Sequence, residues 1–152
     1  MKLEEAIKQK KFKSEDERLI INLVFTSNWL ANEQMYLFKR YGISAQQYNV
    51  LRILRGQHPH AATIGLIQER MLDRMSNASR LVEKLKQKEL VKRNECPKDR
   101  RQVDVLITPK GMDLLAEIDG CEDEMNRVTN GLVPDEKKQL NELLDKLRTN
   151  NN

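Results

Sequence analysis

The stretch from residue 75 to residue 111 constrains the fold most, because its periodicity changes along a short length of chain. Four apolar residues at helical spacing come first and predict an amphipathic helix: Ala78, Leu81, Val82 and Leu85. Residues 103–107 then alternate with a period of two, which indicates a strand with one buried face. Thr108 and Pro109 predict the start of another helix, with Thr as cap and Pro at the first position.

Polar and basic residues occupy the outer side of the predicted helix and the predicted turn. Asn77, Arg80 and Lys84 fall on the side of the predicted helix opposite the apolar stripe, so they should point into solvent. Residues 90–93 read as a first strand, and residues 97–100 as a turn that carries positive charge at or near its tip. A basic helix followed by a basic hairpin is suited to DNA, with the helix in the major groove and the hairpin on the backbone or the neighbouring minor groove.

The distribution of charge supports the same interpretation. The chain of 152 residues has a net charge of +4, but residues 70–110 hold 12 basic and 6 acidic residues, whereas residues 111–152 hold 5 basic and 10 acidic residues. A concentrated basic patch is typical of a protein that binds a polyanion. Charge alone is equally consistent with a solvated surface of mixed sign. Its position on a predicted helix and hairpin favours DNA.

Two shorter helices are expected upstream. Ser44 and Gln47 form a capping box that starts a helix to about Arg55, and Thr63 caps a short helix through about Met71. A brief turn separates this short helix from the amphipathic helix described above. The order helix, turn, helix predicts a helix-turn-helix unit, in which the first helix braces the second.

Long helices are expected on both sides of this core. A capping box at residues 14–17 starts a helix of about 25 residues that ends near Gly42, and apolar residues at helical spacing predict helices over residues 112–148. Gly120 lies inside that second region and allows a bend. The apolar stripes of these helices exceed what the small core can cover, which indicates an interface with another chain.

The residues of the hairpin resemble the MarR family of bacterial transcriptional regulators. The family's wing pattern D-x-R-x(3)-V-x-[LI]-T-x-x-G is matched by Asp99, Arg101, Val105, Ile107, Thr108 and Gly111. Its recognition helix and first wing strand are matched by Ser79, Arg80, Leu81, Val82, Leu85, Leu90, Val91 and Arg93. The likeness covers about residues 14–147.

This resemblance implies a fold and a function. The expected fold is mainly α with a small β-hairpin wing, in a single domain over residues 1–152. The winged helix-turn-helix core would span about 44–110, and the dimerisation helices about 14–41 and 112–148.

The expected function is that of a homodimeric, cytoplasmic repressor that binds a pseudo-palindromic operator in double-stranded DNA. A small, often aromatic effector would bind between the dimer helices and the winged core and release the DNA. Trp29, Tyr36 and Tyr48 are candidates for that pocket or for the core.

The candidate DNA-binding residues are polar or basic and lie on the helix or the wing: Arg74, Ser76, Asn77, Ser79, Arg80, Lys84, Lys98, Arg100 and Arg101. The resemblance places Arg101 in the minor groove, and the alternative is a salt bridge to Asp99, which would support the wing. Arg80 is suited to guanine and Asn77 to adenine, unless they contact phosphate or cap the helix. Ser76 is expected to cap the helix rather than to read a base. The remaining basic residues are expected at phosphates.

Two residues depart from the family pattern. Gln68 stands where a small Ala is usual at the close crossing within the helix-turn-helix, so its side chain must turn outward or change that crossing. Glu89 stands where Gly is usual after the recognition helix, which costs strain if φ is positive there.

Other classes of function have weaker support. No catalytic constellation, bound cofactor or membrane span is expected, and the charged N-terminus does not resemble a signal peptide. His58 and His60 lack a third metal ligand nearby, so a solvated turn is favoured. Cys96 lies near basic residues that favour a reactive thiolate, which leaves a redox-sensing regulator as an alternative, and Cys121 is expected to be buried. A winged-helix module for protein–protein interaction is a further alternative.

Overall fold

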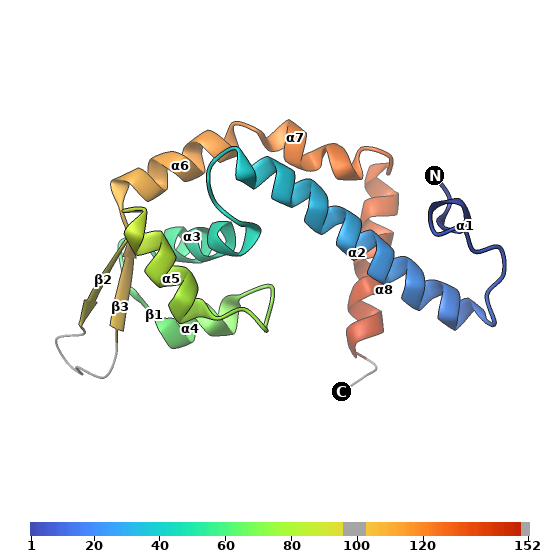
Figure 1. Cartoon of the computed structure of the whole chain (residues 1–152), viewed down its shortest axis with the longest axis horizontal. Coiled ribbons are helices and arrows are strands. Elements are labelled where there is room, and N and C mark those ends of the chain that lie inside the picture. The colour runs from blue at the N-terminus through green and yellow to red at the C-terminus, as the bar shows by residue number, and fades with distance from the viewer. Residues whose placement is uncertain (96–102, 150–152) are drawn as a thin grey trace. The chain divides into compact units, whose positions relative to one another are not determined.

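The computed structural model describes residues 1–95 and 103–149. The chain forms two compact units, Met1–Ala116 and a second unit from Glu117 onward. The elements follow one another in the order α1 Leu3–Ala6, α2 Glu15–Lys39, α3 Ala45–Gln57, β1 Ala62–Thr63, α4 Ile64–Arg70, α5 Ala78–Gln87, β2 Val91–Glu95, β3 Val103–Ile107, α6 Pro109–Asp119, α7 Glu122–Asn126, a 3-10 turn Arg127–Thr129 and α8 Pro134–Thr149 (Figure 1). The mainly helical fold with a small sheet agrees with the expectation.

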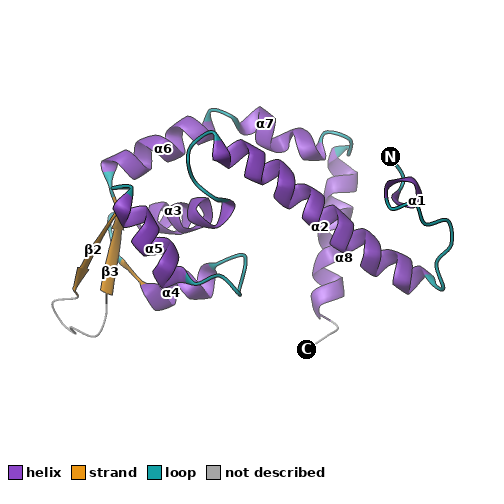
Figure 2. Cartoon of the chain, in the orientation of Figure 1, coloured by secondary structure: helices purple, strands orange, loops and turns teal. Residues whose placement is uncertain are grey.

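The sheet lies at one end of the first unit and is antiparallel (Figure 2). Its central strand is β3, which pairs on one side with β2 and on the other with β1. Val105 faces Ala62 in the register with β1, and Ile107 faces Val91 in the register with β2. The hairpin was expected, whereas β1 was not, because two residues are too few to show a period.

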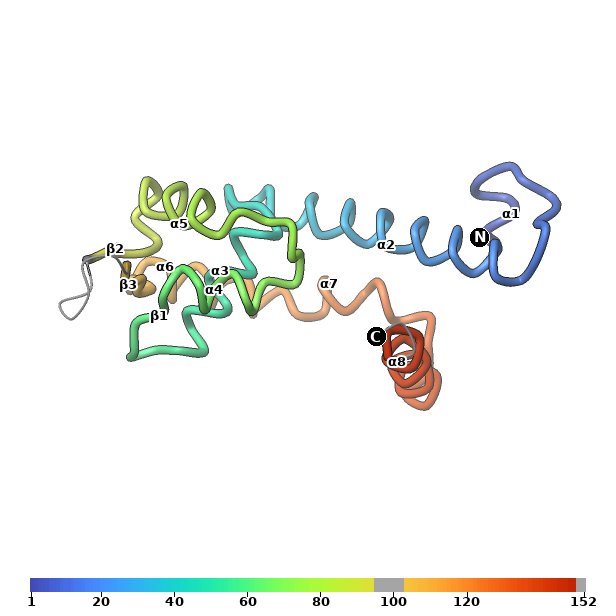
Figure 3. Tube along the Cα trace, turned by 90° about the horizontal axis from the view of Figure 1, so that it is seen from below, coloured from blue at the N-terminus to red at the C-terminus, as the bar shows by residue number. Residues whose placement is uncertain are grey.

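The core of the first unit lies among α3, α4, α5 and the sheet. Its side chains are fully buried and come from all of these elements: Val50, Leu51, Leu54, Ile67, Val82, Leu85 and Val105. At the junction of α2 and α3, the ring of Phe38 stacks on that of Tyr48 with centroids 4.3 Å apart. Beyond this core, α2 extends away as a long helix in two perpendicular views (Figures 1 and 3).

The predicted helix starts are largely confirmed. Ser44 Oγ accepts the Gln47 N–H, and the Gln47 side chain accepts the Ser44 N–H, each at 3.1 Å, which completes a capping box. Thr108 Oγ1 accepts the Gly111 N–H at 3.1 Å at the start of α6. At the start of α2, Ser14 caps as expected, but the Glu17 carboxylate accepts the N–H of Lys13 instead of that of Ser14.

The short α1 is held against α2 by an ion pair between Glu4 and Arg18, with 2.9 Å between Oε1 and Nε. A backbone hydrogen bond and the guanidinium of Arg18 lower the pKa of Glu4. The hydrogen bond to the carboxylate and its charge raise the pKa of Arg18. Leu3 is buried beside this pair, so apolar burial and charge both secure the N-terminal segment.

The helical region that follows the sheet is interrupted. α6 ends at Asp119 and α7 starts at Glu122, so Gly120 lies at a break rather than inside a bent helix. Cys121 is the N-cap residue of α7 and is only half-buried, so the expectation that it is buried was wrong. In the second unit, the apolar side chains of Leu140 and Leu143 on α8 are exposed.

Candidate nucleic-acid interface

The helix α5 presents a polar and basic face to solvent. Its inner face consists of Ala78, Val82 and Leu85, which are fully or almost fully buried, whereas Leu81 is half-buried. Arg80 and Lys84 are exposed, as their spacing predicted, and Ser79 is exposed as well. Burial of one face fixes the helix to the core and leaves the other face for a partner. The structure therefore brings these three candidate residues together on one exposed surface.

The N-terminal end of α5 differs from the prediction in one respect. Asn77, not Ser76, is the N-cap residue, because Asn77 Oδ1 accepts the Arg80 N–H at 3.0 Å. Ser76 Oγ instead donates to Asp73 Oδ2 at 2.9 Å, while Asp73 Oδ1 accepts the Met75 N–H at 3.0 Å. The carboxylate of Asp73 thus organises the turn and leaves the cap to the next residue. The cap occupies one lone pair of Asn77 Oδ1 and directs this amide toward the first turn of α5.

Gln68 connects the two helices of the helix-turn-helix. Its Oε1 accepts the N–H of Ala78 at 3.0 Å, and its Nε2 donates to the carbonyl oxygen of Arg74 at 3.3 Å. The long side chain, at a position where the resemblance led us to expect Ala, therefore spans the turn and contacts the first residue of α5. The distance between Gln68 and Ala78 in the sequence gives no local signal for this contact.

Arg74 and Arg93 also make contacts that sequence reasoning missed. The guanidinium of Arg74 donates to the carbonyl oxygen of Glu69, which directs this exposed side chain back toward the end of α4. Arg93 on β2 pairs with Glu83 on α5, with 3.1 Å between Nη1 and Oε2. The ion pair between Arg93 and Glu83 joins β2, the first strand of the hairpin, to α5.

The candidate residues of the wing tip lie outside the described residues: Cys96, Lys98, Asp99, Arg100 and Arg101. The two strands that flank them are paired from Val91 with Ile107 to Glu95 with Val103. At the base of the hairpin, a Cβ on Gly111 would lie 2.4 Å from the carbonyl oxygen of Leu90. The motif Gly is therefore required by a close approach of two backbones.

Glu89 follows α5 and has a φ of +61°. This positive φ is strained for a residue with a side chain, as expected for a position where the resemblance predicts Gly. The Glu89 carboxylate lies 3.3 Å from Nζ of Lys110, which also donates to the carbonyl oxygen of Lys88 at 3.0 Å. These contacts hold a turn that Gly would adopt without strain.

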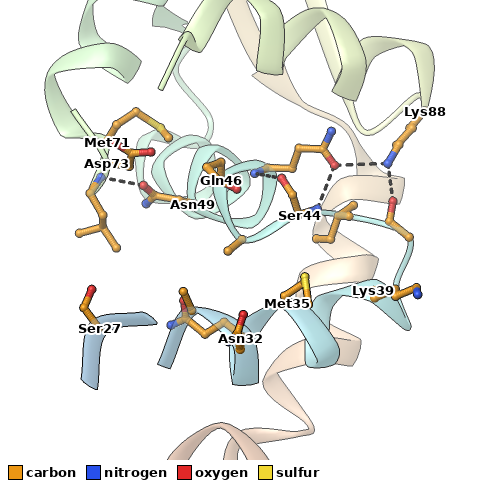
Figure 4. A pocket seen from close by; sticks show the side chains of 17 residues that line it. Ser27, Asn32, Met35, Lys39, Ser44, Gln46, Asn49, Met71, Asp73 and Lys88 are labelled. Atoms are coloured by element: carbon orange, nitrogen blue, oxygen red, sulfur yellow. Dashed lines mark hydrogen bonds between the residues drawn. The ribbon is translucent and has the colours of Figure 1, made fainter. Parts of the chain in front are cut away.

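A cleft of about 950 Å³ lies beside α5, between the C-terminal half of α2, the start of α3 and the turn that precedes α5 (Figure 4). Met35 and Lys39 line it from α2, Ser44 and Asn49 from the region of α3, and Lys88 from the end of α5. Trp29, Tyr36 and Tyr48 are not among its lining residues. Trp29 and Tyr36 are exposed, whereas Tyr48 belongs to the core.

The described residues contain no cluster of three or more metal-ligating side chains. Among the same residues, no helix combines the length and apolar character that a membrane crossing requires.

This fold defines a class of protein. A helix-turn-helix whose second helix exposes a basic face, followed by an antiparallel hairpin, is the architecture of a winged-helix DNA-binding protein. The MarR family model matches residues 41–102. The Staphylococcus aureus HTH-type transcriptional regulator MgrA is 31% identical over 111 residues, which are 73% of this chain and 74% of MgrA. The chain belongs to the MarR family of transcriptional regulators, as the wing motif indicated.

Solved structures agree with this assignment. Bordetella bronchiseptica BpsR, whose DNA binding is regulated by 6-hydroxynicotinic acid, is 25% identical with a TM-score of 0.73 and covers 87% of this chain and 99% of its own. A mutant of Escherichia coli MarR complexed with operator DNA has a TM-score of 0.77 at 21% identity, over 91% of this chain and 99% of that chain, and supports the fold. Because the relatives are transcription regulators and not enzymes, the expectation that this chain is not an enzyme is confirmed.

Proposed function

We propose that this protein is a homodimeric, cytoplasmic repressor that binds a pseudo-palindromic operator and is released from it by a small molecule. The observation that carries the proposal is the exposed face of α5, where Ser79, Arg80 and Lys84 stand on a helix anchored by buried Val82 and Leu85. A rigidly supported helix with a polar outer face is suited to the major groove.

Each candidate residue has a role in this proposal. Arg80 reads a guanine, and Ser79 and Asn77 contact base edges or phosphates near the start of α5. Arg74 and Lys84 contact phosphates, and Ser76 supports the turn through Asp73. In the wing, Arg101 enters the minor groove, Asp99 orients it, and Lys98 and Arg100 contact phosphates. The wing roles are supported by the family motif.

Exposed apolar side chains support a dimer. On α2 they occur along much of the helix: Leu19, Ile20, Val24, Leu30, Met35 and Tyr36. Leu140 and Leu143 form a similar exposed surface on α8. Exposed apolar surfaces of this kind in a single chain are typical of an interface. We propose that residues 1–152 form one dimerising domain, with two copies of α5 about one DNA turn, or roughly 34 Å, apart.

The cleft beside α5 is the proposed site of the effector. It is lined both by α2, a dimer helix in this proposal, and by the start of α3, so an occupant would contact both parts. BpsR provides an example of a similar protein whose DNA binding responds to a small ring compound. An effector releases DNA only to the extent that it binds the non-binding arrangement more tightly.

The proposal is tested by fluorescence anisotropy with the intergenic duplex upstream of the protein's own gene, over a range of salt concentrations. The controls are a scrambled duplex and Arg101→Ala, and light scattering gives the mass in solution. Tight binding to the native duplex alone, weakening steeply with salt and lost in the variant, would support the repressor. Equal, weak binding to both duplexes or a monomeric mass would overturn it and favour an interaction module.

A further inference from the structure

Lys88, which follows α5 directly, is bound to a distant part of the chain. Its ammonium donates to the carbonyl oxygen of Gly42 and to Oε1 of Gln47, the second at 3.3 Å (Figure 4). Gly42 and Gln47 belong to the junction between α2 and α3 and are more than 40 residues away in the sequence. One side chain therefore connects the end of the recognition helix to the base of α2.

The two acceptors of Lys88 are held in place by contacts that do not involve the lysine. Gln47 is 6% exposed, and its Oε1 also accepts the N–H of Ser44 at 3.1 Å within the capping box of α3. Gly42 has a φ of +67°, the conformation in which the chain leaves α2. A hydrogen bond from an ammonium is stronger than a neutral one, and it is directional when its acceptor is held in place.

A second contact secures the other end of α5. In the turn that precedes the helix, the N–H of Leu72 donates to Oδ1 of Asn49 on α3 at 2.9 Å. The Asn49 contact involves α3 alone, whereas the Lys88 contact also includes Gly42 in the loop that follows α2. All four side-chain or backbone partners line the cleft: Gly42, Gln47, Asn49 and Leu72.

We infer that Lys88 is a positioning residue that sets the orientation of the recognition helix relative to the junction of α2 and α3. It acts on operator binding without contacting DNA. The inference rests on the proposed function and adds a means of regulation, because a movement of α2 that displaces Gly42 shifts the acceptors of Lys88. The opposing interpretation is that Lys88 is one more phosphate contact.

The matched pair Lys88→Met and Lys86→Met separates these interpretations. Lys86 is also exposed near the end of α5, so both variants lose the same charge from the same region. Affinity for the operator and for a scrambled duplex is measured in the full-length protein over a range of salt concentrations. We expect Lys88→Met to lower operator affinity about tenfold more than Lys86→Met does. The two variants should have equal affinities for the scrambled duplex and equal salt slopes. A phosphate contact predicts a similar loss on both duplexes and a salt slope smaller by about one, which would overturn the inference.

Hydrogen–deuterium exchange without DNA tests the contact separately from the proposed function. In Lys88→Met we expect faster exchange at the Ser44 amide, whose acceptor Gln47 loses its lysine, and at Glu89 and Leu90 after α5, whereas Lys86→Met leaves the Ser44 amide unchanged. Unchanged exchange at Ser44 in Lys88→Met would overturn the inference even if the wild type binds an operator. If the wild type binds no operator, the exchange result still decides whether Lys88 holds the helix to the junction.

The variant Gln47→Glu should strengthen the contact with Lys88. A glutamate still accepts the Ser44 N–H and presents a charge to Lys88. We expect it to tighten operator binding severalfold in the wild-type background and to have no such effect in Lys88→Met. An equal effect in both backgrounds would contradict coupling between the two residues.

Discussion

Gln68 on α4 and Ala78 at the start of α5 are joined by a hydrogen bond of 3.0 Å from the Ala78 N–H to Gln68 Oε1. The first N–H groups of a helix have no partner within that helix, so Gln68 satisfies one of them from outside. Because its Nε2 donates to the carbonyl oxygen of Arg74, the same amide also holds the turn. Gln68 therefore braces the start of α5 from the neighbouring helix.

Replacing Gln68 by Ala should lower the free energy of unfolding by about 1–2 kcal/mol, because two hydrogen bonds across the turn are lost. Urea denaturation measures the loss. Gln68→Glu is the matched control, since it keeps an acceptor for Ala78 and should lose less. An unchanged unfolding midpoint for Gln68→Ala would show that water replaces both contacts.

Gly111→Ala should destabilise the protein by about 2–3 kcal/mol, because the new Cβ would lie 2.4 Å from the Leu90 carbonyl oxygen and 2.8 Å from Ile107 Cγ1. Gly56→Ala is the control within α3, where a Cβ meets no atom within 4 Å. It should stabilise the protein by about 0.5–1 kcal/mol. Similar unfolding midpoints for the two variants would contradict the close approach at the base of the hairpin.

Glu89→Gly should stabilise the protein by roughly 0.5–1 kcal/mol, because Gly adopts the observed φ of +61° without strain. The exposed pair with Lys110 contributes little and offsets only part of this gain. Thermal unfolding measures the difference. Glu89→Ala removes the pair but keeps the strain, so a rise in its melting temperature equal to that of the Gly variant would rule out backbone relief as the cause.

Arg80→Ala and Lys84→Ala should weaken DNA binding in different ways. Loss of a base contact by Arg80 should cost about 1–3 kcal/mol and relax the preference at one base pair. Loss of a phosphate contact by Lys84 should weaken binding to all sequences and reduce the salt slope by about one. Anisotropy with single-base-pair variants of the operator separates the two effects, and a uniform loss for Arg80→Ala would assign it to the backbone.

The contact between α1 and α2 should depend on pH. Because a backbone hydrogen bond and the guanidinium of Arg18 hold the pKa of Glu4 below its ordinary value of 4.5, these contacts of the charged carboxylate stabilise the folded segment above that value. This contribution is lost as the pH falls through the lowered pKa. The N–H of Ile7 donates to the Leu3 carbonyl oxygen. In the wild type its amide exchange should be slower than in Glu4→Gln at neutral pH and should approach that of the variant in acid. Parallel profiles would show that the pair does not secure α1.

Much of the fold could be predicted from local patterns. The stripe that includes Val82 and Leu85 is buried, Ser44 and Gln47 form their capping box, and Val105 and Ile107 face the core. One error arose where two adjacent polar residues compete for the same role. Ser76 was expected to cap α5, but the carboxylate of Asp73 takes its hydroxyl and the cap moves to Asn77. A sequence pattern does not show which of two adjacent polar side chains will be engaged elsewhere.

The sequence by itself determined the main helices, the two strands of the hairpin and the face of α5 that is turned outward, because periodicity and capping depend on neighbours along the chain. It also contained the wing motif that marks the MarR family. Only the tertiary structure decided that Gln68 contacts Ala78, that Arg93 contacts Glu83 and that Lys88 contacts Gly42. These partners lie 10 to 46 residues apart, and their polar atoms meet only once packing has fixed how α3, α4, α5 and β2 cross.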